Sequence, residues 1–345
     1  MESSFEKKNW KAPFFTVWIG QAFSLLGSNL VQFALVWYLT KLTGSAVVLT
    51  TATLVAMLPQ IFLAPIAGSI VDRGNRRRIM IAADTCIALV TLGLAVLFAL
   101  GVVQIWHIYV ILFLRSLGGA FHGPAFTAST SLMVPKEHLA RIQGFNQMLN
   151  GGLSIFAAPL GALLLELLPM QGVIAVDVVT AAIAVGTLVF IRIPQPPPME
   201  EEVAGVKNTL WQDMRAGFRY VLSWPGLLIV LLMATLINFL LTPAGALSPL
   251  LIRLRFGGGA QELGWFEAAL GAGAIVGGLL LGAWGGFKRK IVTAMAGLIG
   301  LGDSHRKYRI RSWEPVPSGA RCTRCKWFDA AYCQWFTGGD DAGNS

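Results

Sequence analysis

Residues Phe14 to Leu39 read FFTVWIGQAFSLLGSNLVQFALVWYL, an apolar run without a charged side chain. A helix of about 20 residues crosses the roughly 30 Å hydrocarbon core of a bilayer, so this run is long enough to span it. It is also longer than the apolar region of a typical signal peptide, and no small-residue cleavage site follows it. The run therefore predicts a first membrane-spanning helix rather than a cleaved leader.

Comparable apolar runs repeat along the chain, separated by short polar turns. Eight of them are long enough to cross a bilayer. The expected spans are residues 14–39, 47–71, 79–101, 106–131, 142–166, 172–192, 226–250 and 263–287. A ninth apolar stretch starts at Ile291 but meets charged residues from Asp303 after about 18 Å of helix, which is too short to cross. The pattern predicts an all-α integral membrane protein.

The overall composition fits a chain that lies mostly in lipid. Hydrophobic residues make up 55% of the 345 residues, charged residues make up 13%, and the mean hydropathy is +0.63. The net charge of +9 could indicate nucleic-acid binding, but the lysines and arginines gather in the turns instead of forming a stripe along one helix. The expected partner is the lipid bilayer, and nucleic acid is not.

Basic residues mark alternate turns and so indicate the orientation. They precede the first span and follow the second, fourth and eighth spans: Lys7, Lys8 and Lys11; Arg73, Arg76, Arg77 and Arg78; Lys136 and Arg141; Lys288, Arg289 and Lys290. Because turns rich in lysine and arginine stay in the cytoplasm, we expect a cytoplasmic amino terminus. Arg253 and Arg255, placed between the seventh and eighth spans, break the alternation.

A long polar stretch, residues 194–225, separates the first six spans from the rest. It opens with Gln195 and three prolines, followed by Glu200 to Glu202, which predicts an extended linker. Apolar residues then recur at helical spacing: Leu210, Trp211, Met214, Phe218, Val221 and Leu222. The spacing predicts an amphipathic helix lying along the membrane interface.

The turn after the second span carries the most specific motif, GSIVDRGNRRR from Gly68 to Arg78. We expect Gly68 to allow a close helix contact, Asp72 to accept from helix-terminal N–H groups, and the arginines to lie at anionic headgroups. A simple positive-inside anchor explains the arginines but leaves the placement of the glycine and the aspartate unexplained.

The turn resembles the loop signature of the major facilitator superfamily of secondary transporters. The resemblance rests on Gly68, Asp72, Arg73, Gly74, Arg76 and Arg77. The turn after the eighth span, GAWGGFKRK from Gly282, is similar to a second copy without the acid, as in a duplicated transporter. The resemblance implies a helical bundle with a six-helix amino-terminal half, residues 1–193, the linker, 194–225, and an incomplete carboxy-terminal half, 226–302.

Three further stretches narrow the resemblance. RSLGG from Arg115 is similar to the superfamily's pattern in its fourth helix, and AAPLGA, with Pro159 and Gly161, looks like a shortened antiporter motif in which Ala158 replaces a glycine. RIMIAADT from Arg78 looks most like the drug and siderophore exporters that include macrolide efflux pumps. The resemblance implies proton-coupled efflux of amphipathic small molecules, such as macrolides or siderophores, across a bacterial plasma membrane, without a cofactor or metal.

Ionisable side chains inside a span are expensive and are therefore functional candidates. Arg115 and His122 lie seven residues apart on one face of the fourth span, and the resemblance associates this arginine with proton coupling. Asp177 in the sixth span and Glu267 in the eighth are the candidate proton-binding carboxylates. Asp84 lies close to the arginine turn, where an ion pair with that turn is the simpler expectation.

Several uncharged residues have two possible roles. Asn29, Gln32, Gln147 and Asn150 could hydrogen-bond a substrate or a neighbouring helix. Trp18, Phe33 and Trp37 could line a pocket or anchor the spans at the interface. The glycine runs 119–123 and 273–277 predict close helix contacts.

The composition changes abruptly at Asp303. Residues 303–345 show neither helical nor strand periodicity and resemble no transporter, so we expect a disordered tail. Cys322, Cys325, Cys333 and His305 have the spacing of at most one zinc pair, which predicts no metal site. The superfamily has twelve spans, so a frameshift or similar lesion is the working hypothesis, and we expect little transport from this chain.

Two other functions stay open at this stage. The same architecture could import a solute or move lipids, and the chain could instead be a non-transporting membrane scaffold that binds a partner through its linker and tail. An enzyme is disfavoured, because the spans contain no nucleophile–base pair, metal cluster or phosphate loop. Neither the substrate nor the oligomeric state can be read from the sequence.

Overall fold

A computed structural model describes residues 10–195 and 210–284. The described elements are α1 (Lys11–Thr43), α2 (Ala46–Arg73), α3 (Arg76–Ala99), α4 (Ile105–Met133), a 3-10 turn η1 (Lys136–His138), α5 (Leu139–Leu167), α6 (Met170–Phe190), α8 (Leu210–Ser223), α9 (Pro225–Phe256) and α10 (Ala260–Trp284). No strand occurs within these ranges. The described residues up to Gly278 form one compact unit.

Eight of the described helices are long and apolar enough to cross a membrane, which confirms the expected set of spans. Their bounds differ most at α9, which runs to Phe256 instead of ending near residue 250. The expected turn containing Arg253 and Arg255 is therefore wrong, since both residues lie in the last turn of this helix. There Arg253 donates to the carbonyl oxygen of Thr40 at the end of α1.

The ends of the helices follow ordinary local chemistry. Gly44 closes α1 in a left-handed conformation, with φ 58°, which glycine adopts without strain. Asn75 begins α3 by accepting from the backbone N–H of Arg78 at 3.1 Å. Pro225 occupies the first turn of α9, where a missing N–H breaks no hydrogen bond.

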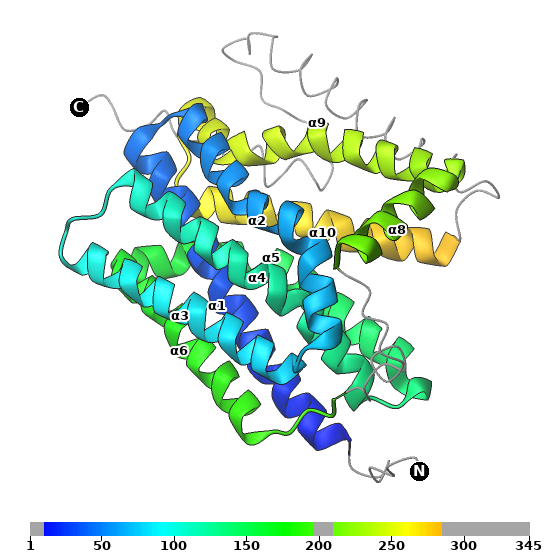
Figure 1. The fold of residues 1–345 in the computed structure, drawn as a ribbon. Coiled ribbons are helices and arrows are strands. Elements are labelled where there is room, and N and C mark those ends of the chain that lie inside the picture. The colour runs from blue at the N-terminus through cyan, green and yellow to red at the C-terminus, as the bar shows by residue number, and fades with distance from the viewer. Residues whose placement is uncertain (1–9, 196–209, 285–345) are drawn as a thin grey trace, which may run out of the picture. The chain divides into compact units, whose positions relative to one another are not determined.

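Helices α1, α2, α3, α4 and α6 form a closely packed group. In Figure 1, α4 runs along α2, while α3 lies between α4 and α6 and α1 packs against both α6 and α5. Helix α9 contacts α1, α2 and α8. The amphipathic helix expected in the linker is confirmed as a helix, α8, with Tyr220 and Leu222 exposed.

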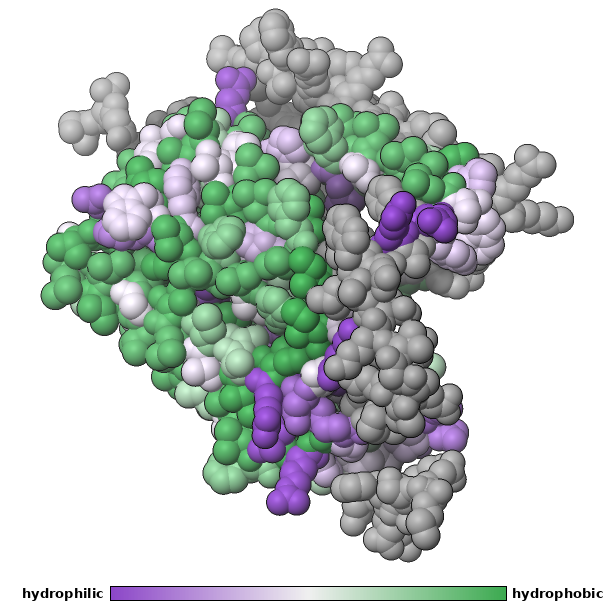
Figure 2. Space-filling model, in the orientation of Figure 1, coloured by the Kyte–Doolittle hydropathy of each residue, from purple (hydrophilic) through white to green (hydrophobic). Residues whose placement is uncertain are grey.

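The outer surface is suited to lipid. Large apolar side chains are exposed along most helices, including Phe62, Leu89, Phe190 and Phe239. Figure 2 shows a face that is mostly hydrophobic, with hydrophilic residues gathered mainly toward its lower edge. Soluble proteins rarely expose apolar surface on this scale, so a bilayer is the environment that this fold requires.

Some expectations fall on residues outside the described ranges. They are the prolines and glutamates of residues 196–202, the basic turn at 288–290, the apolar stretch from Ile291, and the tail with its cysteines.

Candidate functional site

A polar layer crosses the helix bundle between two apolar layers. One apolar cluster contains Leu35, Leu94 and Leu112, and the other contains Val17, Met80, Ala125 and Leu188. Buried polar residues lie between these positions along each helix: Gln21 and Ser24 on α1, Asp84 and Thr91 on α3, Arg115, Ser116 and His122 on α4, and Asp177 on α6. The layer is the candidate functional site, because buried charges inside a membrane mark substrate and ion pathways.

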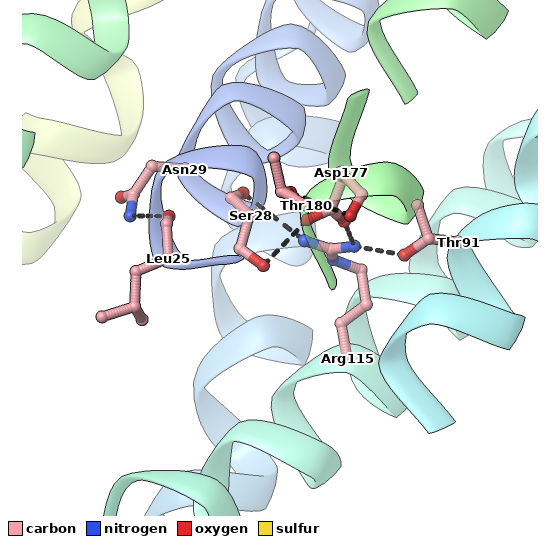
Figure 3. A network of polar contacts seen from close by, with 7 residues as sticks. All are labelled: Leu25, Ser28, Asn29, Thr91, Arg115, Asp177 and Thr180. Carbon is pink, nitrogen blue, oxygen red and sulfur yellow. Dashed lines mark hydrogen bonds and ion pairs between the residues drawn. The ribbon is translucent and has the colours of Figure 1, made fainter. Parts of the chain in front are cut away.

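Arg115 and Asp177 form an ion pair at the centre of this layer. A guanidinium nitrogen of Arg115 donates to Asp177 Oδ2 and to Thr91 Oγ1, and its second terminal nitrogen lies 3.4 Å from the carbonyl oxygen of Ser28. Ser28 Oγ donates to Asp177 Oδ1 at 3.1 Å. Figure 3 shows the guanidinium pointing between α1, α3 and α6. Only 1% of the Asp177 side chain is exposed, and the contacts of the pair join four helices, α1, α3, α4 and α6.

Gly27 lets α1 approach α6 at this pair. A Cβ atom at this position would lie 3.0 Å from the Cα atom of Asp177 and would also meet the side chain of Thr180. Thr180 turns its hydroxyl back to the carbonyl oxygen of Asp177, at 3.0 Å. A small residue is therefore needed on α1 for the ion pair to close.

His122 and Asp84 form a second pair in the same layer. His122 Nε2 lies 3.3 Å from Asp84 Oδ1 and 2.7 Å from Gln21 Oε1, and Gln21 Nε2 donates to Asp84 Oδ2 at 3.0 Å. The expectation that Asp84 pairs with the arginine turn is wrong. Asp84 lies two turns into α3, on the buried face that also carries Met80 and Thr91, and so points into the bundle.

A cavity of about 350 Å³ opens onto this second pair. It lies between α1, α2, α3 and α4, and its polar lining consists of Ser24, Ser28, Asn29, Gln32, Gln60, Asp84, Arg115, Ser116 and His122. The hydroxyl oxygen of Ser116 is buried and has no hydrogen-bond partner among the residues described. The cavity therefore offers both charge and free hydrogen-bonding capacity to a small molecule.

Glu267, the other candidate carboxylate, lies apart from these pairs. It is half-buried on α10, and its carboxylate makes no hydrogen bond or ion pair with any residue in the described ranges. It does not line the cavity described above. The neighbouring residues Leu263 and Phe266 belong to an apolar cluster that joins α1, α5, α9 and α10.

Two arginines of the GSIVDRGNRRR turn bind carbonyl groups of neighbouring helices. Arg76 donates to the carbonyl oxygen of Ala128 on α4 at 2.9 Å. Arg77 donates to the carbonyl oxygens of Leu188 and Val189 on α6 at 2.6 and 2.5 Å. The sequence predicted only that these arginines lie at lipid headgroups, and it did not predict their contacts with other helices. Leu188 and Val189 lie in the last turn of α6, where free carbonyl groups carry partial negative charge, so Arg77 stabilises that helix end. Arg76 joins the turn to α4 before the last turn of that helix.

The other residues of the motif differ in their surroundings. Asp72 is 65% exposed and lies 3.9 Å from Arg76, while Arg73 is exposed. The close contact expected at Gly68 is not found among the described residues, since no described atom lies within 4 Å of a Cβ placed there. Gly74 ends α2, and a Cβ placed there would lie 2.7 Å from the carbonyl oxygen of Ile70 in the last turn of the same helix.

The antiporter-like motif on α5 packs against α1 and α10. A Cβ at Gly161 would lie 2.9 Å from Phe33 Cδ1, and a Cβ at Gly264 would lie 3.0 Å from Pro159 Cα. Gly271 approaches the carbonyl oxygen of Ser154 in the same way, at 2.7 Å.

The expected glycine contacts were partly misplaced. Within the described residues, Gly123, Gly273 and Gly277 have open space, and Gly119 is only in ordinary contact with Gln60. The tight contact on α4 occurs at Gly118 instead, against Ile87.

The uncharged candidates separate into two groups. Asn29 and Gln32 line the cavity, although Asn29 also donates to the carbonyl oxygen of Leu25 at 2.7 Å. Gln147 and Asn150 are exposed on α5.

The aromatic candidates pack against neighbouring helices. Trp18 donates to Asn146 at 2.8 Å, and Phe33 is buried with Trp37 packed beside its cluster. None of the three aromatic residues lines the cavity.

Sequence reasoning missed Gln21, which is fully buried and links Asp84 to His122, and Ser28 and Thr91, which bind the ion pair. Helical spacing could have found Gln21, because it shares one face of α1 with Val17, Ser24 and Ser28.

A family model described as transmembrane secretion effector matches residues 10–294. This chain belongs to the transmembrane secretion effector family of the major facilitator superfamily. Members of this superfamily are multi-pass transporters of small molecules, so membership places the chain among membrane transporters. No group of three or more His, Cys, Asp or Glu side chains able to hold a metal occurs in residues 10–195 and 210–284.

Three named members of the superfamily align with most of this chain. Macrolide efflux protein A of Streptococcus pyogenes is 36% identical over 296 residues, which covers 86% of this chain and 72% of that protein. Macrolide efflux protein A of Enterococcus faecalis is 34% identical over 261 residues, 76% of this chain and 80% of that protein. The uncharacterized MFS-type transporter YkuC of Bacillus subtilis is 28% identical over 287 residues, 80% of this chain and 64% of that protein. The expected resemblance to macrolide efflux pumps is confirmed.

Proposed function

We propose that this chain is a proton-coupled exporter of amphipathic small molecules of the macrolide class. The observation that carries the proposal is the polar layer with its cavity, found in a chain that is 36% identical to a macrolide efflux protein. Siderophores, a second class of amphipathic cargo, are the other substrates to be tested. The chain would lie in a bacterial plasma membrane with its amino terminus in the cytoplasm.

The candidate coupling residues are the ionisable groups inside the spans, Arg115, His122, Asp177 and Glu267. Burial of a charge in a membrane is unfavourable unless a partner compensates it, and two of these four residues compensate each other. Adding or removing a proton in such a layer changes which helix contacts are stable. That dependence is what a proton-driven transporter needs to alternate between two states.

The proposal also assigns roles to the parts of the chain. Residues 1–193 would form one wall of the transport pathway, residues 226–302 would contribute to the other, and α8 in the linker 194–225 would lie along the membrane interface. The motif from Gly68 to Arg78 would hold α4 and the carboxyl end of α6 as the walls move.

The test is transport by cells that lack their own macrolide exporters and express residues 1–345. We expect these cells to accumulate less radiolabelled macrolide than cells with an empty vector, by a margin that the expected impairment keeps small, and a protonophore to abolish the difference. An inhibitor of ATP synthesis that leaves the proton gradient intact should not abolish it. Equal accumulation in both strains would refute the proposal for macrolides, and the same assay with a ferric siderophore tests the second class.

Direction is tested in inside-out vesicles. An acidic interior should drive macrolide uptake into these vesicles, because export from the cell corresponds to entry into an inverted vesicle. Uptake driven by the opposite pH gradient would identify an importer instead. Stoichiometric capture of a protein partner without any flux would favour a scaffold.

A further inference from the structure

The hydrogen bonds around His122 fix which of its nitrogens carries a proton. Gln21 donates its amide N–H to Asp84 Oδ2 at 3.0 Å, so its carbonyl oxygen faces His122 Nε2 at 2.7 Å. The same Nε2 lies 3.3 Å from Asp84 Oδ1. Because both neighbours of Nε2 are acceptors, Nε2 holds a proton in the neutral ring.

The other ring nitrogen, Nδ1, is the place where a second proton can be added. It has no hydrogen-bond partner among the described residues, and the ring lines the cavity. The ring of Phe126 stacks on the imidazole, with centroids 6.2 Å apart, and holds its orientation. Because Nε2 already carries a proton, a proton that arrives through the cavity binds at Nδ1.

The remaining charges near this pair are few. Helix α4 contributes Arg115, helix α6 contributes Asp177, which is near enough to act on Asp84, and these two residues neutralise each other. The described cavity residues of α1 and α2 are uncharged. With His122 neutral, an ionised Asp84 has hydrogen-bond donors but no counter-charge of its own among the described residues, and protonation of His122 supplies one.

The two pairs differ in their access to the cavity, although Arg115 itself belongs to its lining. The Arg115–Asp177 pair is fully bonded, and Asp177 is absent from the cavity lining. His122 and Asp84 both line the cavity, next to the unpartnered hydroxyl of Ser116. An incoming molecule can thus reach the second pair without breaking the first.

We propose that Asp84 and His122 form an exchange site, at which the cationic group of an amphipathic substrate and a proton compete. The inference rests on the proposed function and specifies its substrate class. With His122 neutral, the cavity binds a cation against the charge of Asp84, while Ser116 accepts or donates a hydrogen bond. When Nδ1 takes up one proton, the imidazolium compensates Asp84 and one substrate cation leaves. Arg115 and Asp177 serve as a fixed clamp.

The test is binding of radiolabelled tetraphenylphosphonium, a permanent lipophilic cation, to the full chain in lipid nanodiscs between pH 5 and 8. We expect the affinity to fall about tenfold per pH unit on the acid side, because one proton displaces one cation. The variant His122→Gln should bind the cation at every pH without this fall. The exposed residue His138 provides the matched control, and His138→Gln should keep the wild-type pH profile.

Asp84→Asn should lose most cation binding while a neutral macrolide analogue is unaffected. If Asp84→Asn does not fold, the pH profile of His122→Gln decides. A wild-type profile in His122→Gln would overturn the inference, and so would cation binding that does not depend on pH in the wild-type chain. Macrolide flux that survives in His122→Gln with its pH dependence intact would refute the exchange site and leave the proposed function standing. Cation binding that depends on pH, without any macrolide flux, would support the exchange site and refute the proposed function.

Discussion

Arg115 on α4 and Asp177 on α6 are joined by an ion pair from which solvent is almost completely excluded. Each member also has other partners, Thr91 for the arginine and Ser28 for both residues. Removing one member of such a pair leaves the other as an uncompensated buried charge, whereas replacing both with apolar groups is far less harmful. Single and double replacements of the pair should therefore change the free energy of unfolding by different amounts.

Asp177→Asn is expected to lower the free energy of unfolding by roughly 3–5 kcal/mol, because Arg115 then lacks its counterion. The double variant Arg115→Met with Asp177→Leu should recover most of this loss. The measurement is unfolding in mixed detergent followed by tryptophan fluorescence. Glu166→Gln, which neutralises an exposed carboxylate on α5, is the control and should change stability by less than about 0.5 kcal/mol. Equal losses of unfolding free energy in Asp177→Asn and Glu166→Gln would contradict a stabilising role of the Arg115–Asp177 ion pair.

Arg77→Ala is expected to destabilise the chain by about 1–2 kcal/mol, since the carbonyl groups of Leu188 and Val189 lose a charged donor. Arg78→Ala removes the same charge from the same turn, but the Arg78 side chain is exposed and makes no hydrogen bond with a described residue. Comparing the two variants by thermal unfolding therefore separates the helix-end contact from the general effect of charge. The prediction fails if both variants unfold alike.

Gly271→Ala is expected to weaken the contact between α10 and α5 and to lower stability by about 1–3 kcal/mol, because the added Cβ would overlap the backbone of Ser154. Gly273→Ala, on the same helix with open space around it, should be neutral or slightly stabilising. Cross-linking yield between cysteines placed on α5 and α10 provides a second readout. An unchanged melting temperature and yield in Gly271→Ala would show that this contact does not form.

The orientation can be measured by cysteine labelling in a background in which all four native cysteines are serine. Asn75→Cys, in the arginine turn, should react with a membrane-impermeant maleimide only after the cells are opened. Ser45→Cys, in the preceding turn, should react in intact cells. The reverse pattern would place the amino terminus outside.

The sequence was sufficient to predict the eight long helices, because hydrophobic length is set directly by the thickness of the bilayer. It also identified Arg115, Asp177 and His122 as intramembrane charges. It did not predict how they pair. Contacts between helices depend on the rotation of each helix, and a shift of one residue rotates a side chain by about 100°.

Asp84 illustrates the limit. Its distance along the chain from the arginine turn suggested an ion pair there, whereas the helical repeat that it shares with Met80 and Thr91 directs it inward. The glycines show the same limit, since Gly68 and Gly273 have open space among the described residues while Gly118 and Gly271 are in tight contact with other helices. Sequence alone identifies small residues, but only the packing shows which of them meet another helix.

The two buried pairs also differ in when their partners are synthesised. Asp84 and His122 lie on adjacent helices, α3 and α4, so a single helical hairpin can carry both out of the translocon already matched. Arg115 must wait for Asp177, 62 residues further along the chain. At about 5–20 residues per second, this interval lasts roughly 3–12 s. During that time the ribosome-bound intermediate holds an unmatched arginine, and this is the stage at which membrane quality-control proteases have their best opportunity to remove it.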